Sequence, residues 1–258
     1  MIKAVFFDVD GTLISHKTSS IPTSALKALQ MLKEKGILIF LATGRHKLEL
    51  DDLPVGNIEF DGYVTLNGQY CYNGEGVIHS MPVPKSNLEN VVREMEINPF
   101  PCEFVEADRI YINYVDEIVE KAQDAINTPI PEIGSLKEGV NHEVLLVLPF
   151  GMENRQDKLK ELLPDCKMTR WHEHAFDIIN AAGGKEKGIE KVLEYYNIDR
   201  KDVMAFGDGD NDVSMFKYAG LSVCLANGSK LALEAADYVS SDIDADGIYN
   251  ALKHFNII

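Results

Sequence analysis

The sequence predicts an α/β protein, a doubly wound, Rossmann-like core with a parallel sheet and an inserted α+β domain. Three observations support this fold class. Short apolar runs alternate with helical patterns at both ends of the chain, residues 82–182 lose that order, and polar clusters follow the apolar runs. Strands that alternate with helices imply right-handed crossovers, which place helices on both faces of one sheet.

The N-terminal part begins with an apolar run at residues 3–7, typical of a strand buried on both faces of a parallel sheet. A helical pattern opens at Pro22 and closes at Gly36. Further strands are expected at 37–42 and 61–68. The apolar face of the helix is expected to hold three leucines, Leu26, Leu29 and Leu32.

The pattern changes after residue 68, where a hairpin with a turn around Asn73 and Gly74 is expected. Strands and helices then follow one another in mixed order, as in an α+β module. The first pattern returns at "GGKEKG", and a helix, the strand 203–206 and further alternating elements complete the chain. We therefore expect a core of residues 1–81 and 183–258, with residues 82–182 as an inserted domain.

Composition excludes several classes of protein. The net charge is −16, from 41 acidic against 25 basic residues, which argues against nucleic acid and anionic membranes as partners. No apolar run approaches the ~20 residues of a membrane span. The four cysteines lie far apart and are expected to be reduced thiols, so the cytoplasm is the expected compartment. Nothing in the sequence indicates an obligate protein partner.

Polar clusters follow three of the predicted strands. Asp8, Asp10 and Thr12 follow the first, "TGR" at 43–45 follows the second, and "GDGDND" at 207–212 follows the strand 203–206. In open parallel sheets, ligands bind outside the carboxyl ends of the strands. If these strands are neighbours, several carboxylates crowd at one edge, and a hard divalent cation such as Mg²⁺ would relieve the repulsion.

These residue types also suit phosphoryl chemistry. Mg²⁺ usually completes its shell with water and substrate phosphate oxygens. Thr43, the glycine-containing turns around it and a lysine could bind the remaining phosphate oxygens. A carboxylate near the phosphorus can form an aspartyl-phosphate, and a second acid two residues later can protonate the leaving oxygen and then activate water.

Four motifs resemble those of the haloacid dehalogenase superfamily: "DVDGT" at 8–12, "TGR" at 43–45, "GGKEKGIEKV" at 183–192 and "GDGDND" at 207–212. Their order and the position of the insertion resemble the Cof-type phosphatases with a class IIB cap. The stretch "RWHEHAFDI" is most similar to bacterial sugar-phosphate phosphatases of that group. The resemblance covers essentially the whole chain.

The resemblance implies a role for each matching residue. Asp8 would be the nucleophile and a Mg²⁺ ligand, and Asp10 would be the general acid and base, with its backbone carbonyl on the metal. Asp208 would be the third metal anchor. Three further residues would support this site, namely Thr12, Asn211 and Asp212.

Thr43, Gly44 and Lys185 would bind the transferring phosphoryl group. The spacing K-x-x-Gly188 favours Lys185, and Lys187 stays open as the alternative. The inserted domain would act as a cap that contacts the leaving group, with Arg170, His172 and Asn113 as candidates.

The expected function is therefore Mg²⁺-dependent hydrolysis of small phosphorylated metabolites, in first place sugar phosphates. Two alternatives stay open: a phosphotransferase or mutase of the same superfamily, and a signalling module that only accepts a phosphoryl group. A second acidic segment, 242–253, matches the first half of a calcium loop but places Lys253 where a bidentate glutamate is needed. We expect Asp246 and Gly247 to form a turn before the final helix instead.

Overall fold

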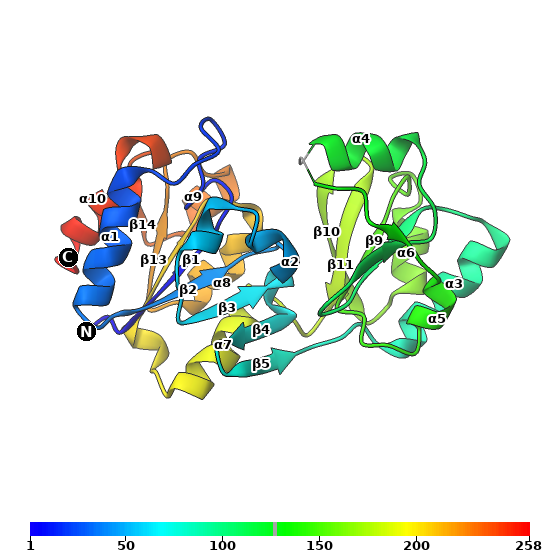
Figure 1. Ribbon diagram of the computed structural model, residues 1–258, viewed down its shortest axis with the longest axis horizontal. Helices are drawn as coiled ribbons and strands as arrows, with labels where there is room; N and C mark the ends of the chain where they lie inside the picture. Colours follow the sequence, from blue (N-terminus) through cyan, green and yellow to red (C-terminus); the bar gives the residue numbers. More distant parts are fainter. Residues whose placement is uncertain (126–127) are drawn as a thin grey trace. The chain divides into compact units, whose positions relative to one another are not determined.

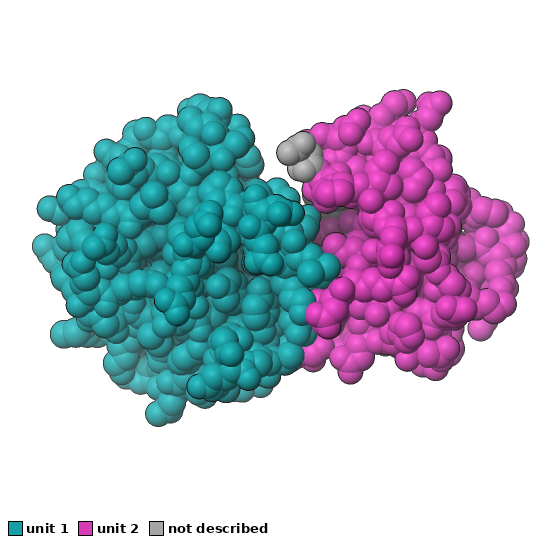
Figure 2. Space-filling model, in the orientation of Figure 1, with its two compact units in different colours: residues 1–79, 184–258 teal, residues 80–183 magenta. Residues whose placement is uncertain are grey.

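The computed structural model describes residues 1–125 and 128–258, without the side chains of residues 170–172 (Figure 1). The chain divides into two compact units (Figure 2). Unit 1 consists of residues 1–79 and 184–258, and unit 2 consists of residues 80–183. The functional division into a catalytic core and a cap stays a prediction.

Unit 1 is built on an eight-stranded sheet with the order β14-β13-β12-β1-β2-β3-β4-β5. The strands from β14 to β3 are parallel, and β4 pairs antiparallel with β3. The strands are β1 (Ala4–Phe7), β2 (Leu38–Ala42), β3 (Gly62–Thr65), β4 (Tyr70–Asn73), β5 (Gly76–Ser80), β12 (Val203–Gly207), β13 (Leu221–Cys224) and β14 (Tyr238–Val239).

Helices cover both faces of this sheet, which confirms the predicted doubly wound α/β class. On one face, α1 (Thr23–Glu34) and α10 (Gly247–His254) pack against the sheet. On the other face lie α7 (Lys185–Tyr196), α8 (Val213–Tyr218) and α9 (Lys230–Ala235). The shorter helices of unit 1 are α2 (Lys47–Leu50) and the 3-10 turns η1 (Pro54–Asn57), η2 (Leu66–Gly68), η3 (Arg200–Asp202), η4 (Asp210–Asp212) and η5 (Ile243–Ala245).

Strand β1 lies at the centre of the sheet. Its side chains alternate between the faces: Val5 and Phe7 pack with α1 and α10, and Ala4 and Phe6 pack with α7. Because β1 pairs in parallel with β12 on one side and β2 on the other, the loops after these three strands meet at one edge. The three polar clusters are therefore neighbours, as the sequence predicted.

Two details of the expected elements are wrong. Leu26 is 43% exposed, and the buried face of α1 is made by Ala25 and Ala28 with Leu29 and Leu32. At 100° per residue, position 26 lies about 110° from the centre of the face that the other four residues form. The third strand ends at Thr65 rather than at residue 68, since a left-handed turn follows.

Unit 2 contains a six-stranded sheet with the order β10-β11-β9-β6-β7-β8. In the described part of the chain, neighbouring strands of this sheet run antiparallel, and β7 and β8 run parallel. Its strands are β6 (Cys102–Val105), β7 (Ile110–Ile112), β8 (Glu132–Ile133), β9 (Leu146–Pro149), β10 (Cys166–His172) and β11 (Ala175–Asn180).

Helices also cover both faces of this second sheet. One face packs against α3 (Lys85–Ile97), α5 (Leu136–Gly139) and α6 (Gln156–Leu162), and the other against α4 (Glu117–Ala125). The mixed order of strands and helices is the predicted α+β pattern. Among residues 1–125 and 128–258, no helix has the length and apolar character needed to cross a membrane.

Candidate functional site

Asp8 lies at the end of β1, where the strand leaves the sheet. Its backbone N–H donates to the carbonyl of Phe206, so the residue stays in register with β12. Its side chain is buried. The chain then turns through Gly11, whose φ of 82° favours glycine. A Cβ on Gly11 would lie 2.2 Å from Oδ2 of Asp208. The absence of a side chain here allows the first and fourth motifs to approach each other.

The loop after β12 supplies two more acids. Asp212 accepts hydrogen bonds at Oδ2 from the backbone N–H groups of Asp208 (3.0 Å) and Gly209 (2.9 Å), which fixes the loop. Asp208 accepts a hydrogen bond from the hydroxyl of Thr12 at 2.7 Å. The predicted support from Thr12 therefore has a specific form in the structure, since its side chain orients Asp208.

Lys185 is the first residue of α7 and is fully buried among these acids. Its Nζ lies 2.6 Å from Oδ1 of Asp8 and 2.6 Å from Oδ1 of Asp212. Lys187 is on a different side of the helix, about half exposed, and pairs with Glu190 at 2.9 Å. The geometry thus brings Lys185, and not the alternative Lys187, to the acidic cluster.

The cluster has more negative than positive charge. Burial raises the pKa of Asp8 well above its ordinary value, Asp212 and Asp208 raise it further, and Lys185 opposes them. Burial also raises the pKa of Asp208 to about 6, against the hydrogen bond from Thr12. Burial by itself lowers the pKa of Lys185, but the two carboxylates beside it outweigh this effect and raise it. One lysine faces three acids, so a further cation would stabilise their ionised forms.

The residues present fit a divalent cation. One carboxylate oxygen from each of Asp8, Asp208 and Asp212 lies within 4.8 Å of the others. An all-oxygen donor set of few carboxylates suits Mg²⁺. The predicted set also contained Asp10, through its backbone carbonyl. The side chain of Asp10 is not part of this group of carboxylates. It is directed to Arg45, which donates a hydrogen bond to each of its two oxygens at 2.9 Å.

Thr43 and Gly44 follow β2 beside this cluster. Thr43 is buried, and its hydroxyl accepts a hydrogen bond from the N–H of Arg45 at 3.1 Å. Gly44 leaves room for the side chain of Asn67, to which a Cβ on Gly44 would approach within 3.2 Å. Asn67 in turn accepts a hydrogen bond from Asn211 at 3.1 Å.

Sequence reasoning assigned no role to three residues that belong to this network: Arg45, Asn67 and Asn227. Arg45 holds Asp10, and its Nη1 also lies 3.6 Å from Glu49. Asn227 donates to the carbonyl of Gly11 at 2.8 Å. Arg45 stands in the quoted "TGR", and Asn67-Gly68 is a recognisable turn signal. Asn227-Gly228 is the same kind of turn signal, but nothing local in the sequence relates it to the loop after Asp10.

The remaining sequence candidates lie elsewhere. Asp244 and Asp242 of the calcium-like segment lie 3.1 and 3.9 Å from Lys17 Nζ. Asp246 precedes the final helix with a left-handed φ of 64°, whereas Gly247, expected in the same turn, is already the first residue of α10. The carboxamide of Asn113 is bonded to the backbone of Phe100 and Cys102, so it supports unit 2 internally. The side chains of Arg170 and His172 lie outside the described residues.

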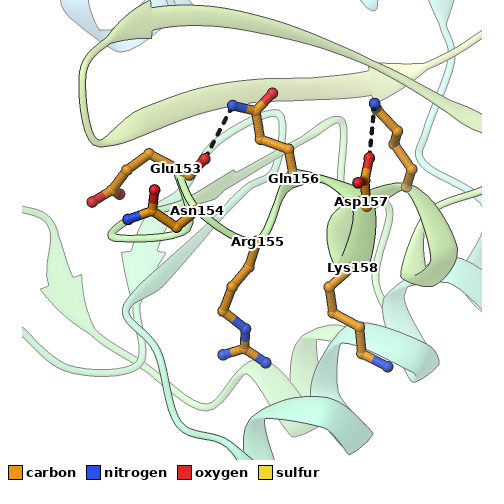
Figure 3. A pocket seen from close by; sticks show the side chains of 7 residues that line it. Glu153, Asn154, Arg155, Gln156, Asp157 and Lys158 are labelled. Carbon is orange, nitrogen blue, oxygen red and sulfur yellow. Dashed lines mark hydrogen bonds and ion pairs between the residues drawn. The ribbon is translucent and has the colours of Figure 1, made fainter.

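Unit 2 also carries a hollow of about 500 Å³ at the start of α6 (Figure 3). Its charged side chains are paired within the unit: Lys160 contacts Asp157 at 3.3 Å, and Arg155 contacts Glu94 at 2.9 Å. None of the residues singled out from the sequence lines it. The residues that line it are Glu153, Asn154, Arg155, Gln156, Asp157, Lys158 and Lys160.

Comparison with known proteins identifies a shared family. The sequence model of the haloacid dehalogenase-like hydrolases matches residues 5–252. YkrA of Bacillus subtilis (strain 168), which is named as a phosphatase, is 30% identical over 258 residues, 99% of this chain and 98% of YkrA.

Two solved structures share the whole fold. One is BT4131, described as a sugar phosphatase of subclass IIB, with 37% identity, a TM-score of 0.87 and coverage of 99% of this chain and 100% of the other. The second is the phosphatase BT1666 from Bacteroides thetaiotaomicron, with 31% identity, a TM-score of 0.91 and coverage of 100% and 96%.

Proposed function

Because this chain belongs to the haloacid dehalogenase-like hydrolases and is a phosphoric monoester hydrolase, we propose that its substrates are small sugar phosphates. The reaction would proceed through an aspartyl-phosphate on Asp8, with Mg²⁺ bound at the acidic cluster. The substrate class is carried over from BT4131, a sugar phosphatase with the same fold. The observation that carries the proposal is the buried carboxylate of Asp8, 2.6 Å from Lys185 and grouped with Asp208 and Asp212.

In the first half of the reaction, a carboxylate oxygen of Asp8 attacks the phosphorus. A bond forms between this oxygen and phosphorus, and the bond between phosphorus and the leaving oxygen breaks. Lys185 and Thr43 neutralise and hold the phosphoryl oxygens. Asp8, Asp208 and the backbone carbonyl of Asp10 would hold Mg²⁺, which would supply positive charge near the same oxygens.

Asp10 handles the protons in both halves. It protonates the leaving oxygen, and then, as a carboxylate, it takes a proton from the water that attacks the aspartyl-phosphate. That attack breaks the bond between phosphorus and Asp8 and releases inorganic phosphate. In this structure both oxygens of Asp10 accept hydrogen bonds from Arg45, and each oxygen keeps a second lone pair for the leaving group or the water.

Residues 82–182, which make up unit 2 apart from Ser80, Met81 and Gly183, are proposed to select the leaving group. Their support is the insertion of this unit between β5 and α7, directly before Lys185. The cytoplasm is the proposed compartment, since the four cysteines are free thiols.

The test is phosphate release from a panel of sugar phosphates, nucleoside monophosphates and pyridoxal phosphate, with Mg²⁺ or with EDTA. Asp8→Asn is the test variant, and Asp199→Asn, at an exposed position of unit 1, is its matched control. Multiple turnovers that need Mg²⁺, persist in the control and vanish in Asp8→Asn support the proposal. Undiminished turnover by Asp8→Asn removes the nucleophile, and transfer to an added sugar in preference to water indicates a phosphotransferase.

A further inference from the structure

A turn of three left-handed residues joins β3 to β4 in unit 1. Leu66, Asn67 and Gly68 have φ angles of 51°, 52° and 89°. Glycine adopts this region freely and asparagine tolerates it, but a leucine there is strained. Such a conformation persists only where the surrounding structure determines it. The contacts of the turn therefore indicate what holds it in place.

The backbone of the turn is bonded to the segment that begins with Thr43. The N–H of Leu66 donates to the carbonyl of Arg45 at 3.1 Å, and the N–H of Asn67 donates to the carbonyl of Thr43 at 3.0 Å. Gly68 packs against the residue before Lys185, because a Cβ on Gly68 would lie 2.0 Å from the carbonyl oxygen of Gly184. One short turn thus touches both segments that carry the proposed phosphate-binding groups.

The side chain of Asn67 reaches a third segment. Its Oδ1 accepts a hydrogen bond from Nδ2 of Asn211 at 3.1 Å, and Asn211 stands in the loop that holds Asp208 and Asp212. The side chain of Asn67 is also adjacent to Gly44, where a Cβ would lie 3.2 Å from its Nδ2. With 9% of its surface exposed, Asn67 is largely enclosed by these neighbours.

We propose that Asn67 is a positioning residue for the phosphoryl group, and that it acts by fixing the carboxamide of Asn211. This inference rests on the proposed function, because it assigns Asn211 to the phosphate-binding edge. Asn211 belongs to a short 3-10 turn, η4. Because Asn67 Oδ1 is an acceptor, it requires Nδ2 of Asn211 to point toward Asn67. The carbonyl oxygen of the Asn211 carboxamide must then point the other way. Without that acceptor, the carboxamide of Asn211 rotates more freely.

The expected effect follows from the loss of one hydrogen bond within a preorganised site. If the free energy of a typical hydrogen bond is lost from the bound state, the affinity for phosphate falls about 3- to 10-fold. Asn67→Gly is the appropriate variant, since glycine retains the left-handed backbone and removes only the carboxamide. Asn197→Gly is the matched control, because Asn197 has a φ of 54° at the end of α7 and is exposed.

The measurement is the Kd of inorganic phosphate in excess Mg²⁺, by isothermal titration calorimetry on the full chain. We expect Asn67→Gly to raise this Kd about 3- to 10-fold, and Asn197→Gly to leave it unchanged. Because the proposed route passes through Asn211, Asn67→Gly should have little further effect in an Asn211→Ala background. Thermal unfolding of each variant checks that both glycine variants remain folded.

Three outcomes overturn the inference: a wild-type Kd in Asn67→Gly, an equal rise in Asn197→Gly, or fully additive effects of Asn67→Gly and Asn211→Ala. Should Asn67→Gly fail to fold, a wild-type Kd in Asn211→Ala also overturns the inference. Such a Kd would mean that the carboxamide of Asn211 does not contribute to phosphate binding, so Asn67 could not act through it. Calorimetry needs no turnover, so a lack of phosphatase activity in the wild-type protein would count against the proposed function alone.

Discussion

Replacing Lys185 by methionine tests the charge balance of the site most directly. The substitution keeps the length of the side chain and removes its positive charge. In the structure, Lys185 Nζ lies 2.6 Å from both Asp8 and Asp212, and neither Lys185 nor Asp212 has any exposed side-chain surface. The variant therefore leaves two buried carboxylates without their shared partner.

The magnitude follows from the cost of a broken buried ion pair. Removing one partner of such a pair typically destabilises a protein by about 3–5 kcal/mol. Protonation of Asp8 reduces this cost, because burial and the neighbouring acids already raise its pKa well above 3.8. We therefore expect Lys185→Met to lower the free energy of unfolding near neutral pH, in the absence of metal, by no more than about 3–5 kcal/mol.

The pH dependence has a definite sign. An acid whose folded pKa is raised binds its proton more tightly in the folded state, so its contribution to stability falls as pH rises through that pKa. Without Lys185 the pKa of Asp8 rises further. Lys185 itself titrates above the range of the experiment. The loss caused by Lys185→Met should therefore be smaller at about pH 5 than at about pH 8.

The assay is equilibrium urea unfolding, followed by circular dichroism in EDTA at both pH values. Lys187→Met is the matched control on the same helix, since Lys187 is half exposed and pairs only with a helix neighbour, Glu190; we expect little change. Equal losses in the two variants, or a loss from Lys185→Met that does not depend on pH, would refute this account of the cluster.

Two further predictions concern the metal and the loop beside it. Added Mg²⁺ should raise the melting temperature of metal-free protein more at about pH 7.5 than at about pH 5. Burial raises the pKa of Asp208 to about 6, so at the lower pH protons compete with the metal for this carboxylate. Equal increases in melting temperature at the two pH values would exclude Asp208 as a ligand. Gly11→Ala should weaken Mg²⁺ binding, since its Cβ would lie 2.2 Å from Asp208, whereas Gly36→Ala, also at positive φ but with nothing within 4 Å, should not. The backbone penalty in both variants is about 1–2 kcal/mol; Mg²⁺ titrations that give the same affinity for the two would contradict the predicted contact.

Much of the fold could be predicted because it depends on local pattern. The run Ala4–Phe7 has no polar side chain, and the structure places it at the centre of the sheet, buried on both faces. Asp8, Asp208 and Thr43 follow strands that are neighbours, and parallel strands present their carboxyl ends at one edge. The sequence therefore predicted that these residues meet if their strands are neighbours, and the order of strands in the sheet fulfils that condition.

Tertiary structure decided which partner each of these side chains has. In the sequence the spacing to Gly188 favours Lys185 and leaves Lys187 open, and the structure places Lys185 among the acids and Lys187, half exposed, beside Glu190. Asp10 is bonded to Arg45, 35 residues away, and Asn67 is bonded to Asn211, 144 residues away. Local propensity would not lead a leucine into the left-handed turn at Leu66; its backbone bond to Arg45 helps to hold it there. The sequence by itself thus determined which segments form strands and which polar residues follow them, because both depend on local hydrophobic pattern. The order of the strands in the sheet and the pairing of charges and amides depend on packing between distant segments.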